Sequence, residues 1–283
     1  MPPTDVVAGC SGLVQIYRVD SGEVHALRGV DASFLAGAVT AVVGPSGSGK
    51  STLLRSLALV ERPTAGTMTI AGVDAMTAAP RMLRRLRRSK VAVVLQRPTH
   101  NLYTHLTVTE HLELGARHRG ASRDDVERAI EQVGLVARRR SRPTQLSGGE
   151  QQRLAVAMAS IGNPALLLAD EPTAELDAGS AAAVIDMLRD SAARGTSVVV
   201  NTHDAAVAAA ADRVLALHHG TLHSESFQGS ATVAVIDAVG RVQLPPELLS
   251  EFPDLRAEIR FEDGAVVLRP PTNRPTNGGP GDE

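Results

Sequence analysis

Short apolar runs alternate with amphipathic stretches over about the first 229 residues of the chain. Four runs of four or five residues, each followed by a polar or glycine-containing turn, predict buried strands: Val39–Val43, Val91–Leu95, Leu166–Ala169 and Ser197–Asn201. Helical spacing predicts helices over Ser51–Glu61 and Arg123–Val133, within a mainly helical stretch at about 99–141. Alternating strands and helices are typical of an α/β fold, whose ligands bind at the carboxyl ends of the strands.

The pattern changes at about Ser226–Ser230, where a second unit begins. Ala234–Pro245 predicts two short strands around a glycine turn, Glu247–Leu255 a short helix, and Arg256–Arg269 a hairpin. Residues 270–283 are Pro, Gly, Thr, Asn and charged residues that cannot bury apolar surface, which predicts a disordered tail. We therefore expect a large domain at 1–229, a small mainly-β module at 230–269 and a tail at 270–283.

Composition narrows the class of protein. The chain has 283 residues, 43% of them hydrophobic, and a formal charge of −2, which gives no overall attraction to nucleic acid or to an anionic membrane. Its single cysteine, Cys10, excludes an internal disulfide framework and suits a reducing cytosol. No apolar run approaches the roughly 18–20 residues that span a bilayer, and the first residues do not resemble a secretory signal. We expect a cytoplasmic protein whose membrane role depends on a partner.

A glycine-rich turn joins the first predicted strand to its helix. It fits the phosphate-binding pattern of a glycine, four residues and Gly-Lys-Ser/Thr. Glycines let backbone amides face a phosphate, Lys50 can neutralise the outer phosphates and the Ser51 hydroxyl can ligate Mg²⁺. Only Lys50 and Lys90 are lysines among 29 basic residues, so a lysine here is not background usage. The motif predicts a nucleoside triphosphate held by Gly44, Pro45, Ser46, Gly47, Ser48, Gly49, Lys50, Ser51 and Thr52.

Two further segments carry candidate chemistry. The strand at 165–169 is followed by Asp170, which can hold Mg²⁺, and Glu171, which can orient or deprotonate an attacking water. Adjacent acids also occur on solvated turns, so the pair gains weight from the phosphate loop upstream. Ser147 is a predicted N-cap, and Gly148 and Gly149 leave backbone amides open to an anion, although an ordinary capped helix would look similar.

Together these segments resemble the ATP-binding-cassette (ABC) ATPases over about Val6–Leu222. The phosphate loop, Leu-Ser-Gly-Gly-Glu-Gln-Gln at 146–152 and Leu-Leu-Leu-Ala-Asp-Glu-Pro-Thr at 166–173 have that family's order and spacing. The resemblance implies a P-loop NTPase core with a β-subdomain and a helical subdomain, and hydrolysis of ATP with Mg²⁺. It also implies a head-to-tail pair in which one chain completes the partner's ATP site through its signature segment, whose predicted nucleotide contacts are Ser147, Gly148, Gly149 and Gln151.

The resemblance assigns roles to residues outside these motifs. It implies that Gln96 lies in the loop between core and helical subdomain, that His203 contacts the γ-phosphate and that Tyr17 stacks on adenine. Asp177 would lie in the nucleotide-site loop that contacts the opposite subunit, although Ala-Glu-Leu-Asp stands where the family often has Ser-Ala-Leu-Asp. The alternatives are that Gln96 is a plain loop amide and that Tyr17 is a core residue. The implied catalytic residues are Glu171, His203 and Gln96, and the implied Mg²⁺ ligands are Ser51, Gln96 and Asp170.

Gly22–Val30 and Asn101-Leu102 with Leu106–Val108 resemble the lipoprotein-release and macrolide-efflux branch of the family. This branch implies a subunit that docks on a separate membrane-spanning permease at the inner face of the cell membrane and drives export or mechanical work. The alternative is a soluble ABC ATPase that acts in translation, DNA repair or DNA-binding control. A single cassette, with about fifty residues between Gln96 and Ser147, does not favour that alternative.

The sequence Gly-Arg-Val-Gln-Leu-Pro at 240–245 resembles the AbrB-like swapped-hairpin module, in which two copies interleave, often on DNA. From Ala231 to Arg269, seven acidic residues outnumber four arginines. Phosphate contacts need net positive charge, so we predict dimerisation rather than DNA binding. The arginine runs Arg84–Arg88 and Arg138–Arg140 lack interleaved aromatics and predict solvated helix faces. We expect no nucleic-acid partner.

Overall fold

The computed structural model describes residues 5–20, 22–228, 233–235, 251–252, 257–262 and 265–270. The chain forms two compact units, Met1–Val233 and Ala234–Glu283. Most of the predicted strand pair over 234–245, most of the predicted helix over 247–255 and the tail beyond 270 lie outside the described residues. The division into an ATPase domain, an AbrB-like module and a disordered tail stays a prediction.

A seven-stranded sheet with strand order β11-β10-β9-β3-β8-β7-β6 forms the centre of the first unit. The five strands from β9 to the edge strand β6 run parallel, and β10 pairs antiparallel with β9. The strands are β3 (Val39–Val43), β6 (Val91–Val94), β7 (Leu166–Asp170), β8 (Ser197–Asn201), β9 (Arg213–His218), β10 (Thr221–Phe227) and β11 (Val233–Ala234). All four predicted strands are confirmed, and they are apolar throughout because elements cover both faces of the sheet.

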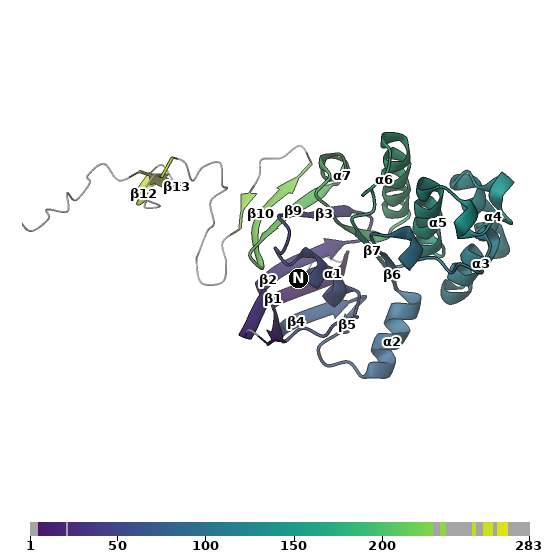
Figure 1. The fold of residues 1–283 in the computed structure, drawn as a ribbon. Helices are drawn as coiled ribbons and strands as arrows, with labels where there is room; N and C mark the ends of the chain where they lie inside the picture. The colour runs from purple at the N-terminus through teal and green to yellow at the C-terminus, as the bar shows by residue number, and fades with distance from the viewer. Residues whose placement is uncertain are drawn as a thin grey trace, which may run out of the picture. The chain divides into compact units, whose positions relative to one another are not determined.

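A second sheet is antiparallel, with the order β2-β1-β4-β5. Its strands are β1 (Val6–Val19), β2 (Gly22–Leu35), β4 (Ala65–Ile70) and β5 (Val73–Asp74). Leu13, Leu27 and Phe34 from this sheet share one buried cluster with Leu53 and Leu57 of helix α1 (Lys50–Leu57) and with alternate residues of the central strands. Helix α1 is therefore fixed in the core between the two sheets, and its N-terminus lies at the carboxyl end of β3 (Figure 1).

Helix α1 ends four residues earlier than the predicted Glu61. Leu59 has a left-handed backbone with φ 57°, and the amides of Val60 and Glu61 both donate to the carbonyl of Arg55. A left-handed residue closes the last turn of a helix, and Pro63 cannot extend it. The reversal turns Glu61 back toward β1, where it contacts a residue of the site.

The remaining helices pack on both faces of the central sheet and at one end of it. They are α2 (Pro80–Ser89), α3 (Val108–Arg119), α4 (Arg123–Gln132), α5 (Gly148–Ser160), α6 (Ala178–Ala193) and α7 (Ala205–Ala210), with single turns η1 (Pro98–His100), η2 (Val136–Arg138) and η3 (Pro143–Gln145). Figure 1 shows α3, α4 and α5 grouped away from the antiparallel sheet. Leu112, Ile130 and Leu154 join these three helices in a core of their own. The predicted helical stretch and the helix at Arg123–Val133 are confirmed.

The described part of the second unit contains one hairpin. Strand β12 (Glu258–Glu262) pairs antiparallel with β13 (Ala265–Arg269), which confirms the strand pairing of the predicted hairpin; the two turn residues lie outside the described ranges. Ile259, Phe261 and Val266 are 71%, 77% and 66% exposed. Side chains alternate along a strand, so Ile259 and Phe261 share one face with Val266 and Leu268 opposite them. Among the described residues of this unit, Ile259, Phe261 and Val266 therefore form an exposed apolar face.

Candidate active site

The loop between β3 and α1 can be built only with glycine at two positions. Gly44 and Gly49 have φ angles of 146° and 104°. A Cβ atom on Gly44 would lie 2.0 Å from the carbonyl oxygen of Leu217, and one on Gly49 would lie 2.5 Å from that of Ala26. The loop therefore sits directly against the ends of β2 and β9, so its backbone position is fixed by the surrounding sheets.

The start of α1 is suited to an anion. Its N-cap is Gly49, and no side chain caps the helix, so the amides of the first turn are not consumed by a side-chain acceptor. The Lys50 ammonium donates to the carbonyls of Gly44 at 2.7 Å and Pro45 at 3.1 Å. This places a positive charge over the loop, in the position where a phosphate would meet both the ammonium and the backbone amides.

Asp170, Glu171 and His203 meet at the carboxyl ends of β7 and β8. Asp170 lies opposite Asn201 in the parallel register, and the Asn201 amide donates to its carboxylate at 3.2 Å. Glu171 has a left-handed backbone with φ 47°, and its N–H donates to the Asn201 carbonyl at 2.9 Å. The Glu171 carboxylate pairs with His203 Nδ1 at 2.9 Å and accepts from the His203 backbone N–H at 3.3 Å.

This arrangement holds a carboxylate in a fixed direction at the carboxyl end of β7, on the same edge of the sheet as the phosphate loop after β3. Glu171 is 17% exposed, whereas the His203 side chain is 75% exposed. A left-handed conformation costs a non-glycine residue about 1–3 kcal/mol and persists only where neighbouring bonds impose it. Here those bonds come from Asn201 and His203. Such a carboxylate can accept a proton from, or orient, a water that attacks a phosphate.

Helix α5 begins with a capping box. The Ser147 hydroxyl accepts from the Glu150 N–H at 3.3 Å, and the Glu150 carboxylate accepts from the Ser147 N–H at 2.7 Å, a bond that lowers the pKa of Glu150. A Cβ on Gly148 would meet nothing within 4 Å, whereas one on Gly149 would lie 2.4 Å from Ser180 Oγ. The Gln151 amide donates to the carbonyls of Pro143 and Leu146 within its own chain, and its predicted contact with nucleotide stays a prediction.

Asp177 and Gln96 lie in the loops that the sequence predicts for them. The Asp177 carboxylate caps α6 by accepting from the Ser180 N–H at 2.9 Å and the Ser180 hydroxyl at 2.7 Å; these two bonds lower its pKa. Gln96 is exposed in the loop between β6 and η1. The Asn101 side chain braces that loop through bonds of 2.9 Å to both backbone groups of Leu95, a support that no sequence pattern indicates.

Tyr17 on β1 is held by a residue that the sequence does not single out. Its hydroxyl donates to the Glu61 carboxylate and lies 3.5 Å from Thr52 Oγ1 of the phosphate-loop helix. Arg55 pairs with the same carboxylate at 3.1 Å. Because Glu61 lies 44 residues from Tyr17, no local pattern points to the contact. The ring is thereby oriented beside the start of α1, as an aromatic platform for a base requires.

The predicted site residues fall into two groups. The phosphate loop, Asp170, Glu171 and His203 lie at neighbouring strand ends of the central sheet, whereas the segment 147–151 starts a helix of the helical layer (Figure 1). Among the described residues, no hydrogen bond or ion pair joins the phosphate loop to that segment. Each group offers an anion-binding helix start, on a different element.

Comparison with known proteins settles the family. The family model described as "ABC transporter" matches residues 27–174. The chain belongs to this family. It is 39% identical over 224 residues to the lipoprotein-releasing system ATP-binding protein LolD 2 of Caulobacter vibrioides, covering 77% of this chain and 97% of that protein. It is also 39% identical over 227 residues to the macrolide export ATP-binding/permease protein MacB of Salmonella typhimurium, covering 78% of this chain and 35% of that protein.

Solved ABC cassettes share the fold. A dimeric post-hydrolysis state of the cassette MJ0796 bound to ADP and Pi is 29% identical, covers 79% of this chain and 100% of that chain, and gives a TM-score of 0.71. A second dimeric structure of MJ0796, a bacterial ABC transporter cassette, gives a TM-score of 0.70 at 31% identity. The predicted P-loop fold, the ABC family and ATP hydrolysis are thus confirmed for this ABC ATPase. Among the described residues, no helix is long and apolar enough to cross a membrane.

Proposed function

We propose that this chain is the ATP-hydrolysing subunit of a system for export or mechanical work, which pairs head to tail with a second copy and drives a separate membrane permease. The chain spans nearly the whole length of its LolD relatives but about a third of MacB, whose name includes a permease. This match supports a subunit whose membrane-spanning part is a separate protein. Its place of work is then the inner face of the membrane, through that permease.

The observation that carries the proposal is the division of the site. One anion-binding helix start lies beside Lys50, Glu171 and His203, and the other, at Ser147 and Gly149, lies in the helical layer. Two copies in head-to-tail order bring one start of each kind to the same nucleotide. ATP then joins the subunits, and hydrolysis releases them, which is a population shift driven by different affinities of the two states.

The residues present fit a magnesium ion. Ser51 in the first turn of α1 offers a hydroxyl, Asp170 at the carboxyl end of β7 offers a carboxylate, and Gln96 lies in the loop after the neighbouring strand β6. Mg²⁺ is usually bound by one or two such oxygen ligands together with phosphates. When bound, the ion would neutralise charge that develops on the phosphates. Glu171 then orients or deprotonates the attacking water, and His203 and Lys50 contact the outer phosphates. Tyr17 stacks on the base, and Asp177 contacts the opposite subunit.

The Glu171→Gln variant tests the proposal. Glutamine keeps the size and the hydrogen bond of the side chain but cannot act as a base. We expect this variant to bind ATP, to hydrolyse it at least roughly 100-fold more slowly and to form dimers in ATP but not in ADP, as measured by light scattering after size exclusion. Persistence of single molecules with bound ATP would refute head-to-tail pairing. Parental hydrolysis rates in the variant would refute the role of Glu171.

A second experiment addresses the permease. Affinity capture of the full chain from detergent-solubilised membranes should recover a protein with several membrane spans. The amount of this protein recovered should change with the nucleotide that is bound at the phosphate loop. Recovery of ribosomes or DNA in its place would favour the soluble class of ABC ATPase.

The hairpin β12–β13 supports a dimerisation role for the C-terminal unit. Two-stranded hairpins are marginal in water unless a partner covers their apolar face. A second copy supplies a matching face for Ile259, Phe261 and Val266. We expect Ile259→Ser/Phe261→Ser to remove any dimer that forms without nucleotide, while the ATP-dependent dimer of the Glu171→Gln chain remains. An unchanged nucleotide-free dimer in that variant would contradict this role.

A further inference from the structure

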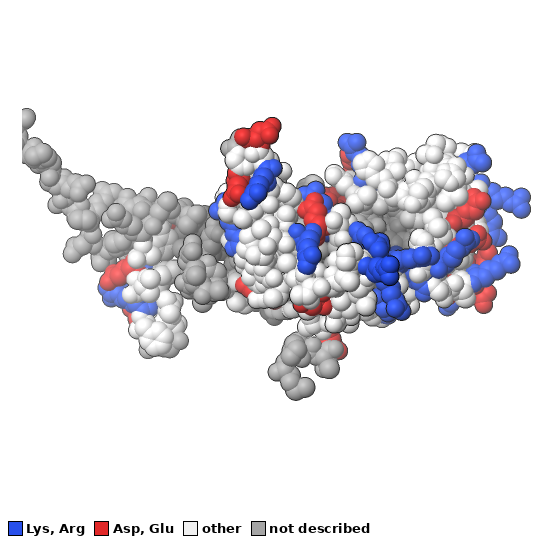
Figure 2. Space-filling view, turned by 90° about the horizontal axis from the view of Figure 1, so that it is seen from below, with Lys and Arg blue, Asp and Glu red and all other residues white. Residues whose placement is uncertain are grey.

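Four arginines form a stripe along the outer side of α2. Arg81, Arg84, Arg85 and Arg88 follow i, i+3, i+4 and i+7 spacing, which places them on one face of a helix. Leu86, which is buried, and the half-buried Leu83 occupy the opposite face and pack on the core. All four arginines are exposed, and we call them the α2 stripe. Figure 2 shows blue side chains gathered over α2.

The α2 stripe has no anionic partner within the part of the chain that the structure describes. None of its four guanidinium groups makes an ion pair or a side-chain hydrogen bond there. Arg87, on the flank of the helix, differs because its Nη1 donates to the Leu59 carbonyl at 3.3 Å. Like charges at i and i+4 destabilise a helix, and the stripe contains two such pairs, Arg81 with Arg85 and Arg84 with Arg88.

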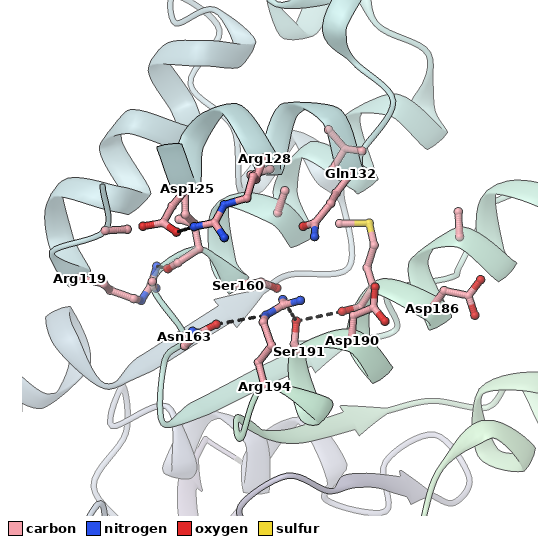
Figure 3. Close-up of a pocket in the computed structure, with 18 of the residues that line it drawn as sticks. Arg119, Asp125, Arg128, Gln132, Ser160, Asn163, Asp186, Asp190, Ser191 and Arg194 are labelled. Carbon is pink, nitrogen blue, oxygen red and sulfur yellow. Dashed lines mark hydrogen bonds and ion pairs between the residues drawn. The ribbon is translucent and has the colours of Figure 1, made fainter. Parts of the chain in front are cut away.

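A pocket between α4, α5 and α6 contains three arginines, Arg119, Arg128 and Arg194, that have acceptors within the protein. It has a volume of about 620 Å³, and its arginines are engaged by its own walls (Figure 3). Arg128 pairs with Asp125, and Arg194 donates to Asn163 Oδ1 and Ser191 Oγ, each at 3.2 Å. Arg119 donates to the Met158 carbonyl at 3.3 Å. The α2 stripe lacks these internal acceptors.

The positive surface continues from α2 onto the end of α3. Arg117 and His118 are exposed in the last turn of α3. Partial burial, followed by the charges of Arg88, Arg119 and Arg117, lowers the pKa of His118. Helices α2 and α3 contact each other, and this places the cations of their exposed sides on adjoining parts of the surface. The patch therefore extends over two elements although the whole chain carries a net charge of −2.

The shape of the α2 stripe indicates which kind of partner it can bind. Helix α2 projects from the edge of the ATPase unit, and its cationic side chains stand out from it (Figures 1 and 2). A projecting stripe fits a flat polyanionic surface rather than a peptide, which needs a groove. Met82, 42% exposed, flanks the stripe with an apolar side chain. We propose that the α2 stripe binds a membrane surface that carries anionic phospholipid headgroups, through guanidinium contacts to their phosphates.

This contact would add a direct attachment to the one that a permease provides, and to that extent it rests on the proposed function. Its test is independent of catalysis. The full chain is mixed with vesicles of phosphatidylcholine alone, or with about one third phosphatidylglycerol, and separated by flotation. We expect binding to the anionic vesicles only, and a steep loss of binding as salt rises. Each arginine removed should weaken binding roughly fivefold, so Arg84→Gln/Arg85→Gln/Arg88→Gln should weaken it roughly 100-fold.

A matched variant separates the stripe from net charge. Arg123→Gln/Arg138→Gln/Arg140→Gln removes three exposed arginines from other elements and should bind anionic vesicles like the parent. Unchanged ATP hydrolysis without vesicles verifies the fold of both variants. Equal loss of binding in the two variants, or equal flotation of the parent with neutral and anionic vesicles, would overturn the proposal. Stripe-dependent binding to duplex DNA that exceeds vesicle binding at equal salt would overturn it in favour of a nucleic acid.

Discussion

The two anion-binding helix starts of this ATPase are built in opposite ways. Helix α1 begins at Gly49, which offers no side-chain cap, and relies on a loop pressed against β2 and β9. Helix α5 begins at Ser147, whose capping box with Glu150 already satisfies part of the helix end. The start of α1 is held by its own chain with free amides that can receive a ligand. The start of α5 is already capped and stable without a ligand, and only the surface at Gly148 remains open. The proposed division of the site between two subunits needs this asymmetry, because the completing half must stay folded when its partner is absent.

The largest effect is expected from removing the positive charge at the start of α1. In Lys50→Ala the ammonium over the phosphate loop is lost, and we expect ATP affinity to fall roughly 100-fold or more, because charge-assisted contacts to phosphate are strong. Equilibrium binding of a fluorescent ATP analogue measures it. Lys90→Ala, at the other lysine of the chain, is the matched control and should bind like the parent. Equal affinities of the two variants would refute the assignment of Lys50.

A second pair of variants tests how tightly the phosphate loop is enclosed. In Gly49→Ala the new Cβ would lie 2.5 Å from the Ala26 carbonyl at a φ of 104°, so we expect a loss of about 3 kcal/mol in the free energy of unfolding. Gly47 has a φ of 77°, but a Cβ there would meet no atom within 4 Å, so Gly47→Ala should cost about 1 kcal/mol. Denaturant titration compares them. A Gly49→Ala chain as stable as Gly47→Ala would contradict the proposed close approach.

Variants at the start of α5 can distinguish an effect on the subunit contact from an effect on the stability of the chain. In Gly149→Ala the new Cβ would lie 2.4 Å from Ser180 Oγ, which also donates to Asp177. This clash should lower the free energy of unfolding by about 1–2 kcal/mol. Gly148→Ala faces open space and should leave stability unchanged or raise it by about 0.5 kcal/mol. Both should weaken ATP-dependent dimerisation of the Glu171→Gln chain, measured by light scattering. Normal dimerisation of the stable Gly148→Ala chain would place this surface outside the interface.

The smallest expected effect is a pH dependence of the capping box. Hydrogen bonding by Ser147 lowers the pKa of Glu150 below its ordinary 4.5. A lowered folded-state pKa means that the stabilisation is present above about pH 4.5 and is lost as pH falls through the folded value. The stability difference between the parent and Glu150→Gln should therefore shrink as the pH is lowered below about 4.5 in thermal melts. A difference that stays constant down to about pH 3 would show that the charge of Glu150 plays no part.

The local structure could be predicted from the sequence where it depends on contiguous residues. The glycine loop before α1, the capped start of α5 and the acid pair at the end of β7 each depend on fewer than ten neighbouring positions, and the strands around them are buried on both faces. Prediction from the sequence failed where the chain folds back on itself. The contact of Tyr17 with Glu61 and that of Gly149 with Ser180 join residues more than thirty positions apart. The early end of α1 depends on a left-handed Leu59, which composition does not indicate.

The anchoring of Tyr17 gives the protein an optical reporter of its own. The chain contains no tryptophan, and its two tyrosines are Tyr17 and Tyr103. Ultraviolet emission therefore comes from two phenol rings, one of which is fixed beside the first turn of α1 through its hydroxyl. The stacking of a purine on that ring that we propose would quench its fluorescence. In a Tyr103→Phe background, such quenching would report the occupancy of the nucleotide site in real time without any attached dye.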